Sequence, residues 1–131
     1  MRIKLTSIPV LDQEQALTFY TETLGFVKKH DIPVGEGARW LTVVARDEQD
    51  GPELLLEPAP NHFEPAKVYQ KALYEAGIPH AQFDVDDIEA EHARLTSLGV
   101  KFSVPPTDIG TAKLAVLDDT CGNHIQLLQS L

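Results

Sequence analysis

The chain has 131 residues, 43% of them hydrophobic, which suits one compact domain with a buried core. Its formal net charge of −9 argues against binding to nucleic acid or to an anionic membrane surface, because both would repel it. No apolar run approaches the roughly 20 residues that span a bilayer, and the N-terminus shows no signal-peptide pattern. The single cysteine, Cys121, argues against a disulfide bond and a cysteine-rich zinc site. We therefore expect a cytoplasmic protein.

The first half of the chain predicts one helix and four strands. Asp12 with Gln15 three residues later forms a capping-box pattern, and Gly25 supplies a helix end. We therefore expect an amphipathic helix over 13–24. Alternating side chains and turn residues predict the four strands, over 3–10, 26–32, 39–45 and 53–57.

The segment 58–78 links the two halves and contains three prolines. Pro65 suits the first turn of a helix, which we expect over 66–76. Helical spacing gives this helix an apolar stripe, made of Tyr69, Ala72, Leu73 and Ala76. A lid, a dimer contact and a plain packed connector are all compatible with this composition.

The second half repeats the first. Asp86 or Asp87 caps a helix over 87–98, which ends at Gly99. Strands are expected over 80–85, 100–104 and 112–117, with a closing strand around Gln126. Four residues of the first helix recur 74 positions later, so that Asp12, Ala16, Leu24 and Gly25 match Asp86, Ala90, Leu98 and Gly99. The first strands of the two halves align with an offset of 75 residues.

The repeated unit is strand–helix–strand–strand–strand. It predicts an α+β fold with two tandem βαβββ modules, whose curved mixed sheets surround a trough. We expect a single domain over 1–131, with module one at about 1–58, the link at about 59–78 and module two at about 79–131. A trough lined by alternate strand residues is a natural site for a small ligand.

Three stretches resemble the vicinal oxygen chelate superfamily, which includes glyoxalase I, the bleomycin and fosfomycin resistance proteins and the extradiol dioxygenases. Residues 16–26, ALTFYTETLGF, are similar to the family's helix-one pattern F-Y-x-x-x-L-G-F. The pair FDVDD at 83–87 and LTSLGV at 95–100 repeats that likeness in the second half. Residues 118–127, DDTCGNHIQL, are similar to the family's ending D-P-x-G-N-x-I-E-L. The resemblance implies the glyoxalase/bleomycin resistance fold over nearly the whole chain.

Enzymes of this superfamily usually hold a divalent metal ion with ligands from the first and last strands of each module. By resemblance, the ligand positions here fall on Leu5, Leu55 (or Leu54 if the register slips), His80 and Gln126. Leucine cannot coordinate, and a neutral glutamine is a poorer ligand than a carboxylate. We therefore expect no metal ion or other cofactor; His80 and Gln126 are the only candidate ligands. Glu53 or Glu57 could reach the trough if the register differs.

Alternation also predicts a ligand-binding face. It pairs Trp40 with Thr42, His80 with Gln82 and His124 with Gln126, each pair on one side of its strand. Gln126 stands in mid-strand, where a polar side chain needs a partner or a ligand. Two roles are open for Trp40, as an aromatic platform for a planar cationic ligand or as a core residue. As sources of a titrating group, the other histidines are expected to have exposed loop or helix-face roles instead, namely His30, His62, His92 and His124.

These residues support three hypotheses for function. The first is a metal-free protein that binds a small organic molecule, resembling the bleomycin-resistance-type binding proteins. The alternative is a metal-dependent glyoxalase-like lyase or dioxygenase with a degenerate ligand set. A third is a metal-free enzyme, with His80 as general base and Gln126 holding an oxyanion. A homodimer is expected, because each module's sheet has an edge that needs covering.

Overall fold

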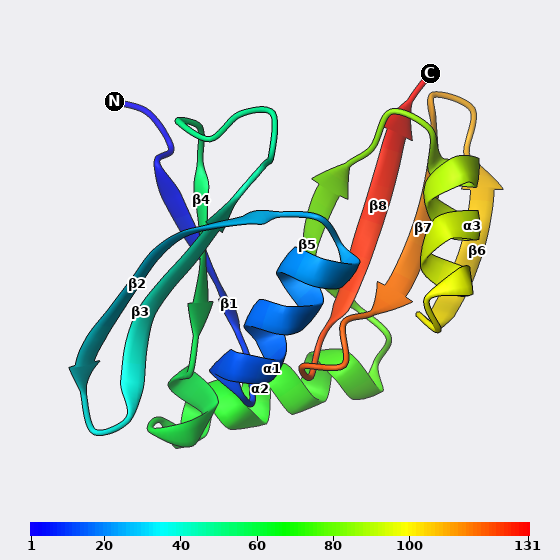
Figure 1. Cartoon of the computed structure of the whole chain (residues 1–131). Coiled ribbons are helices and arrows are strands. Elements are labelled where there is room, and N and C mark those ends of the chain that lie inside the picture. Colours follow the sequence, from blue (N-terminus) through cyan, green and yellow to red (C-terminus); the bar gives the residue numbers. More distant parts are fainter. The chain divides into compact units, whose positions relative to one another are not determined.

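The computed structural model describes residues 1–131 and contains two four-stranded mixed sheets and three α-helices (Figure 1). The chain divides into two compact units, Met1–Tyr69 and Gln70–Leu131. Each unit contains one βαβββ module, so the predicted α+β fold with two tandem modules is confirmed. The predicted single domain and its trough stay predictions.

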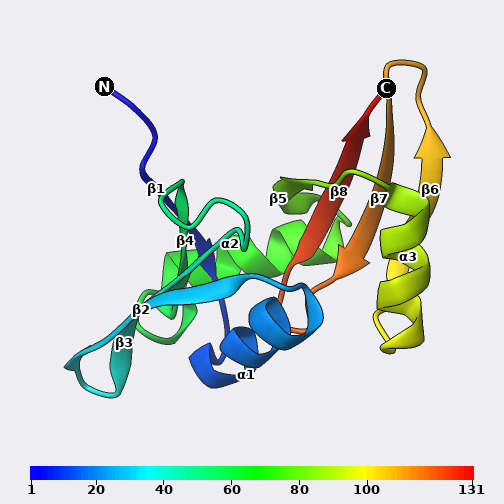
Figure 2. The same cartoon turned by 45° about the horizontal axis from the view of Figure 1, so that its top comes forward.

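The first unit contains one sheet and its covering helix. Its strands are β1 (Leu5–Pro9), β2 (Val27–Gly35), β3 (Ala38–Val44) and β4 (Glu53–Glu57), arranged in the order β1-β4-β3-β2. β1 runs parallel to β4, and the other pairs are antiparallel. Helix α1 (Gln13–Thr18) lies beside this sheet (Figure 2). The face toward α1 is apolar and fully buried at Ile8, Leu41, Val43 and Leu56.

Helix α1 ends differently from its counterpart in the second unit. After Thr18 the chain continues as a π-helical turn, Phe19–Thr23, which accommodates one extra residue in a helix. Asp12 caps α1, whereas Asp87, not Asp86, caps the second helix. The caps are therefore 75 positions apart, while the terminating glycines Gly25 and Gly99 are 74 apart. The π turn explains this difference, and the predicted match of Asp12 with Asp86 is wrong by one residue.

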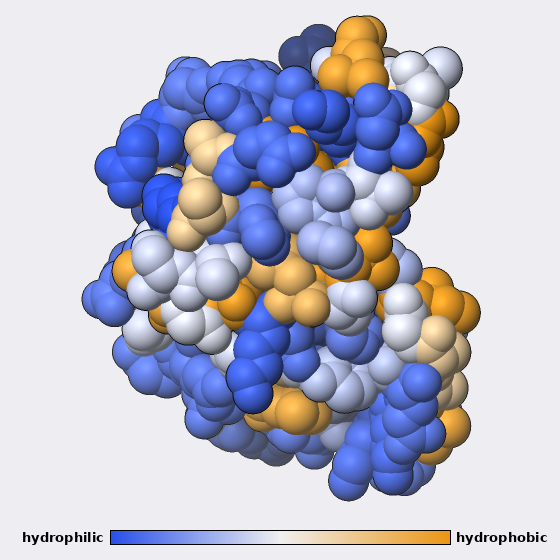
Figure 3. All heavy atoms as spheres, turned by 90° about the vertical axis from the view of Figure 1, so that its right-hand side faces the viewer, coloured by the Kyte–Doolittle hydropathy of each residue, from blue (hydrophilic) through white to orange (hydrophobic).

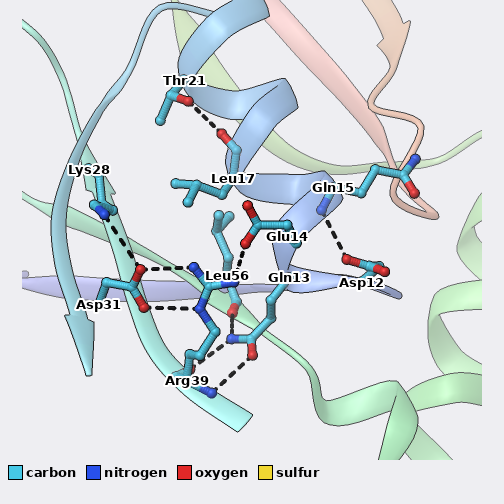
Figure 4. Close-up of polar contacts among 10 residues, drawn as sticks. All are labelled: Asp12, Gln13, Glu14, Gln15, Leu17, Thr21, Lys28, Asp31, Arg39 and Leu56. Atoms are coloured by element: carbon cyan, nitrogen blue, oxygen red, sulfur yellow. Dashed lines mark hydrogen bonds and ion pairs between the residues drawn. The ribbon is translucent and has the colours of Figure 1, made fainter. Parts of the chain in front are cut away.

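Gln13 and Arg39 connect the start of α1 to the sheet (Figure 4). The buried Gln13 amide donates to the carbonyls of Arg39 and Leu56, at 2.7 and 2.8 Å, and accepts from the Arg39 amide at 3.0 Å. The Arg39 guanidinium donates to both carboxylate oxygens of Asp31 and to Glu14. These hydrogen bonds hold the pKa of Asp31 below its usual range and raise that of Arg39. The polar groups at this junction thus have partners, as burial requires.

Helix α2 (Glu64–Glu75) follows the short 3-10 turn Ala59–Asn61 and confirms the predicted helix in the link. Its predicted apolar stripe is wrong, because Tyr69 is 60% exposed and Ala72 and Ala76 are also exposed. The side chain that α2 buries is Gln70, which is 3% exposed. In place of the expected hydrophobic contact, the Gln70 amide lies within hydrogen-bonding distance of the turn before the last strand.

The second unit repeats the arrangement of the first. Its strands are β5 (Pro79–Asp84), β6 (Phe102–Asp108), β7 (Ala112–Asp118) and β8 (His124–Ser130), in the order β5-β8-β7-β6. Helix α3 (Ile88–Ser97) lies beside this sheet (Figure 2). Its buried residues Ile88 and Leu95 belong to the same core as the buried strand residues Leu117, Ile125 and Leu127.

The surface is mostly polar. Figure 3 shows one face, on which hydrophilic residues dominate and hydrophobic ones form small groups. No helix has both the length and the apolar character needed to cross a membrane.

Candidate ligand-binding site

The face of the first sheet that points away from α1 carries Trp40 and Thr42. Trp40 lies opposite Ile32 of the neighbouring strand, and these side chains are 40% and 53% exposed. The alternative in which Trp40 packs in the core is therefore wrong. Thr42, the next residue on the same face, is fully buried. Exposed aromatic surface thus adjoins a buried polar position.

A buried carboxylate lies beside Thr42. Glu53 of β4 is 7% exposed, and its Oε1 atom accepts a hydrogen bond from the Thr42 hydroxyl at 2.8 Å. The His30 Nε2 atom lies 3.6 Å from the same oxygen. The predicted loop or helix-face position of His30 is wrong, because it lies on β2 opposite Thr42. Glu53 shares the face of Trp40 and Thr42, and its entry into the trough stays a prediction.

A β-bulge brings His30 to this face. Lys28 pairs with Val43 and His30 with Thr42, so Lys29 is an extra residue in β2. If Lys29 instead paired with Thr42 in a regular strand, His30 would pair with Leu41 and point toward α1. The sequence signal for this bulge is weak, because Lys28 and Lys29 fit a regular strand equally well.

The face of the second sheet away from α3 carries Gln82 and Gln126. They are direct partners on β5 and β8, and the Gln126 amide donates to Gln82 Oε1 at 2.7 Å. The structure therefore brings together two of the predicted ligand-binding residues. Each amide also retains hydrogen-bonding groups for a ligand, because an amide offers two donors and two acceptor sites.

His80 lies at a second β-bulge. Pro79 pairs with His124 and Ala81 with Ile125, so β5 contains one residue more than β8 over this interval. Burial lowers the pKa of His80, and the negative charge of Asp119 opposes this effect. A lowered pKa favours a neutral imidazole, which can accept a proton.

His124 does not stand free beside Gln126. Its ring stacks on Tyr74 of α2, with ring centroids 4.4 Å apart, and its Nε2 atom lies 3.2 Å from the Tyr74 carbonyl. The Tyr74 hydroxyl donates a short hydrogen bond to Asp118, and this bond raises the pKa of Tyr74. Sequence alternation placed His124 on the strand face correctly, but it gave no sign that α2 would contact the ring.

The turn before β8 is a closed polar network. The buried Asp119 carboxylate accepts hydrogen bonds from the backbone amides of Cys121 and Asn123 and from the Asn123 side chain. From α2, the Gln70 amide donates to the Cys121 carbonyl at 3.3 Å and to Asn123 Oδ1 at 3.2 Å. This network fixes the start of the strand that carries Gln126.

The residues at the superfamily's metal positions do not fit a metal ion. Leu5 and Leu55 offer no donor atom, and the Gln126 amide is hydrogen-bonded to Gln82. No group of three or more His, Cys, Asp or Glu side chains is arranged to hold a metal, whereas catalytic sites commonly use three protein ligands.

A separate pocket of about 380 Å³ opens at the start of α1. Its lining comes from the segments before and within α1, the β2–β3 turn and the 3-10 turn, and includes Glu14, Glu36, Arg39, Asn61 and His62. None of the predicted ligand-binding residues lines it. Arg39 is already paired with two carboxylates, so this pocket offers no unpaired strong cation.

The paired βαβββ modules and the pattern of their ligand positions define the class of protein. The sequence profile of the Glyoxalase/Bleomycin resistance protein/Dioxygenase superfamily matches residues 2–127. The chain belongs to this superfamily, as its three motifs predicted.

Individual relatives cover almost the full chain. YurT of Bacillus subtilis (strain 168) is 53% identical over 129 residues, covering 98% of this chain and 99% of YurT. The crystal structure of UcmS2 is similar with a TM-score of 0.83 and 34% identity, covering 98% of this chain and 97% of UcmS2. The antibiotic binding protein TnmS3 from Streptomyces sp. CB03234 has a TM-score of 0.77 and 30% identity, covering 100% of this chain and 97% of TnmS3.

Proposed function

We propose that this protein binds a small organic molecule without a metal ion or other cofactor. The observation that carries the proposal is the exposed Trp40–Ile32 pair beside the buried, hydrogen-bonded Thr42 and Glu53. Ligand sites typically combine apolar and aromatic surface with a few fixed polar groups. The relation to TnmS3, an antibiotic binding protein, supports a binding role. For the second unit, we propose separately that Gln82, Gln126, His80 and His124 contact a ligand.

A metal-dependent lyase or dioxygenase is less well supported. The superfamily's metal positions include two leucines here, Leu5 and Leu55. The protein therefore acts as a binder, which holds its ligand through aromatic and hydrogen-bonding contacts.

We propose that the protein works as a homodimer in the cytoplasm. Each sheet ends in two edge strands within its own unit, β1 and β2 in the first and β5 and β6 in the second. Exposed strand edges favour pairing with another chain. A reducing compartment suits the single buried Cys121.

Binding is tested by screening organic compounds against the fluorescence of Trp40, which is the chain's only tryptophan. For each hit, calorimetry then compares the wild type with Trp40→Ala, which we expect to weaken binding by about 1–3 kcal/mol. Phe63→Ala is the matched control, because Phe63 is an exposed aromatic of the same unit that lies outside the strands, just before α2. Hits that bind tightly but ignore Trp40→Ala would move the site elsewhere.

The metal-free and dimeric parts of the proposal have their own tests. Elemental analysis after gentle purification should find no stoichiometric zinc, nickel or iron, and about one ion per chain would overturn the proposal. Light scattering at micromolar concentration should give twice the 14.5 kDa of one chain, and a monomer mass would refute the dimer.

A further inference from the structure

Glu53 is a preorganised negative group on the face proposed to bind the ligand. The His30 backbone amide donates to the Thr42 hydroxyl oxygen at 3.2 Å, and that hydroxyl donates to Glu53 Oε1 at 2.8 Å. The Thr42 hydroxyl therefore both accepts and donates a hydrogen bond, and these two bonds fix its orientation. The carboxylate is held in place by a side chain that is itself fully buried.

The contacts of Glu53 within the protein involve one of its two oxygens. The Thr42 hydroxyl and the His30 ring both approach Oε1, and Oε2 is left for another donor. A carboxylate that is nine-tenths buried loses much of its hydration, so a positively charged partner would stabilise it more than a neutral one. The His30 side chain, which lies beside the Glu53 carboxylate, is 45% exposed.

The aromatic surface begins one step along the same strand. Trp40 is the residue of this face next to Thr42, and Ile32 lies directly opposite Trp40. Both side chains are exposed, so a flat ring system can lie on them. The face of tryptophan also attracts cations, because the ring carries negative charge density on its face.

We infer that this face selects a planar organic cation, whose rings lie on Trp40 and Ile32 and whose positive nitrogen meets Glu53. The inference rests on the proposed ligand-binding function and adds the charge of the ligand to it. An anionic ligand would be repelled by Glu53 and by the net charge of −9. A neutral ligand of the same shape would use only the apolar contacts.

The test compares two probes that have the same ring system and differ in charge. These are 10-methylacridinium, a permanent cation, and acridine at a mildly alkaline pH, where acridine is neutral. Titrations of the full chain follow the quenching of Trp40 and the heat of binding. We expect the cation to bind at least about tenfold more tightly, because an ionic contact with a largely buried carboxylate has about this strength. This comparison needs no variant.

Two variants locate the effect. Glu53→Gln removes the charge but keeps an oxygen that accepts from Thr42, so we expect about a tenfold loss for 10-methylacridinium and unchanged binding of acridine. Glu22→Gln removes an equal charge from the exposed surface of the π turn that follows α1 and should change neither affinity. Equal affinities of both probes would overturn the charge selection while leaving the proposed binding function intact. Failure of both probes to bind would overturn the inference too, whereas the proposed function is judged by its own screen.

Discussion

Gly122 occupies a position in the turn before β8 that strongly favours glycine. Its φ angle is +102°, in a region that side chains with a Cβ atom rarely adopt. A Cβ built there would lie 2.7 Å from Gln70 Nε2 and 3.0 Å from Gln70 Cδ. We expect Gly122→Ala to destabilise the second unit in two ways, through the backbone and through Gln70.

The magnitude follows from the two contributions. The backbone cost of alanine at such a φ angle is about 1–2 kcal/mol. The Gln70 amide is the end of a flexible side chain, but moving it breaks its contacts with the Cys121 carbonyl and Asn123 Oδ1. Each hydrogen bond contributes about 0.5–1.5 kcal/mol. The sum is a loss of about 2–5 kcal/mol in the free energy of unfolding.

Urea unfolding followed by circular dichroism measures this loss. Gly99→Ala is the control in the same unit, because Gly99 has a φ angle of +88° and open space around its Cβ position; it should lose only the backbone part. In a Gln70→Ala background the clash is absent, so Gly122→Ala should also fall to about 1–2 kcal/mol. If Gly122→Ala costs no more than Gly99→Ala, or if Gln70→Ala leaves its cost unchanged, the reasoning is refuted.

Three other substitutions test the polar networks. Asp31→Asn should lower the free energy of unfolding by at most about 1 kcal/mol at neutral pH. Because the pKa of Asp31 is lowered from 3.8, the difference between wild type and variant should shrink as the pH falls below that value. A difference that stays constant with pH would contradict the Arg39 pairing. Tyr74→Phe should lower the free energy of unfolding by at most about 1 kcal/mol. Because the pKa of Tyr74 is raised from 10.0, this loss of stability should persist at neutral pH and disappear as rising pH ionises the phenol. Asp119→Ala should cost about 3 kcal/mol or more, since three buried hydrogen bonds are lost. A thermal shift no larger than that of Asp108→Ala, an exposed carboxylate at the end of β6, would count against the network.

The fold was predictable because its signals are local. The caps Asp12 and Asp87 and the helix ends Gly25 and Gly99 mark two copies of one unit, and strand alternation gives the buried faces. The exact offset between the copies was not predictable, because a π turn and a regular turn differ by one residue and look alike in sequence. The buried face of α2 was also missed, because a stripe of apolar residues outweighs a single glutamine in any periodicity argument.

The candidate site was predictable only in part. Alternation correctly put Trp40 with Thr42 on one side of β3, but it gave no sign that Gln82 and Gln126 are direct partners across two strands. It could not show that Glu53 meets Thr42, because that contact joins two strands whose relative register the sequence does not specify. It also missed the stacking of His124 on Tyr74, which depends on a helix separated from it by about 50 residues in the chain.

The bulges in β2 and β5 have a consequence for the evolution of this site. In each module a histidine lies at the bulge, His30 after the extra residue Lys29 and His80 as the extra residue itself. If β2 became regular with Lys29 paired to Thr42, His30 would turn to the opposite side of its strand without being replaced by another amino acid. Among relatives, the presence or absence of these bulges is therefore as informative as substitutions, because an aligned histidine can face the ligand in one protein and the core in another. Ligand preference can thus diverge through strand register while the amino-acid composition of the site stays the same.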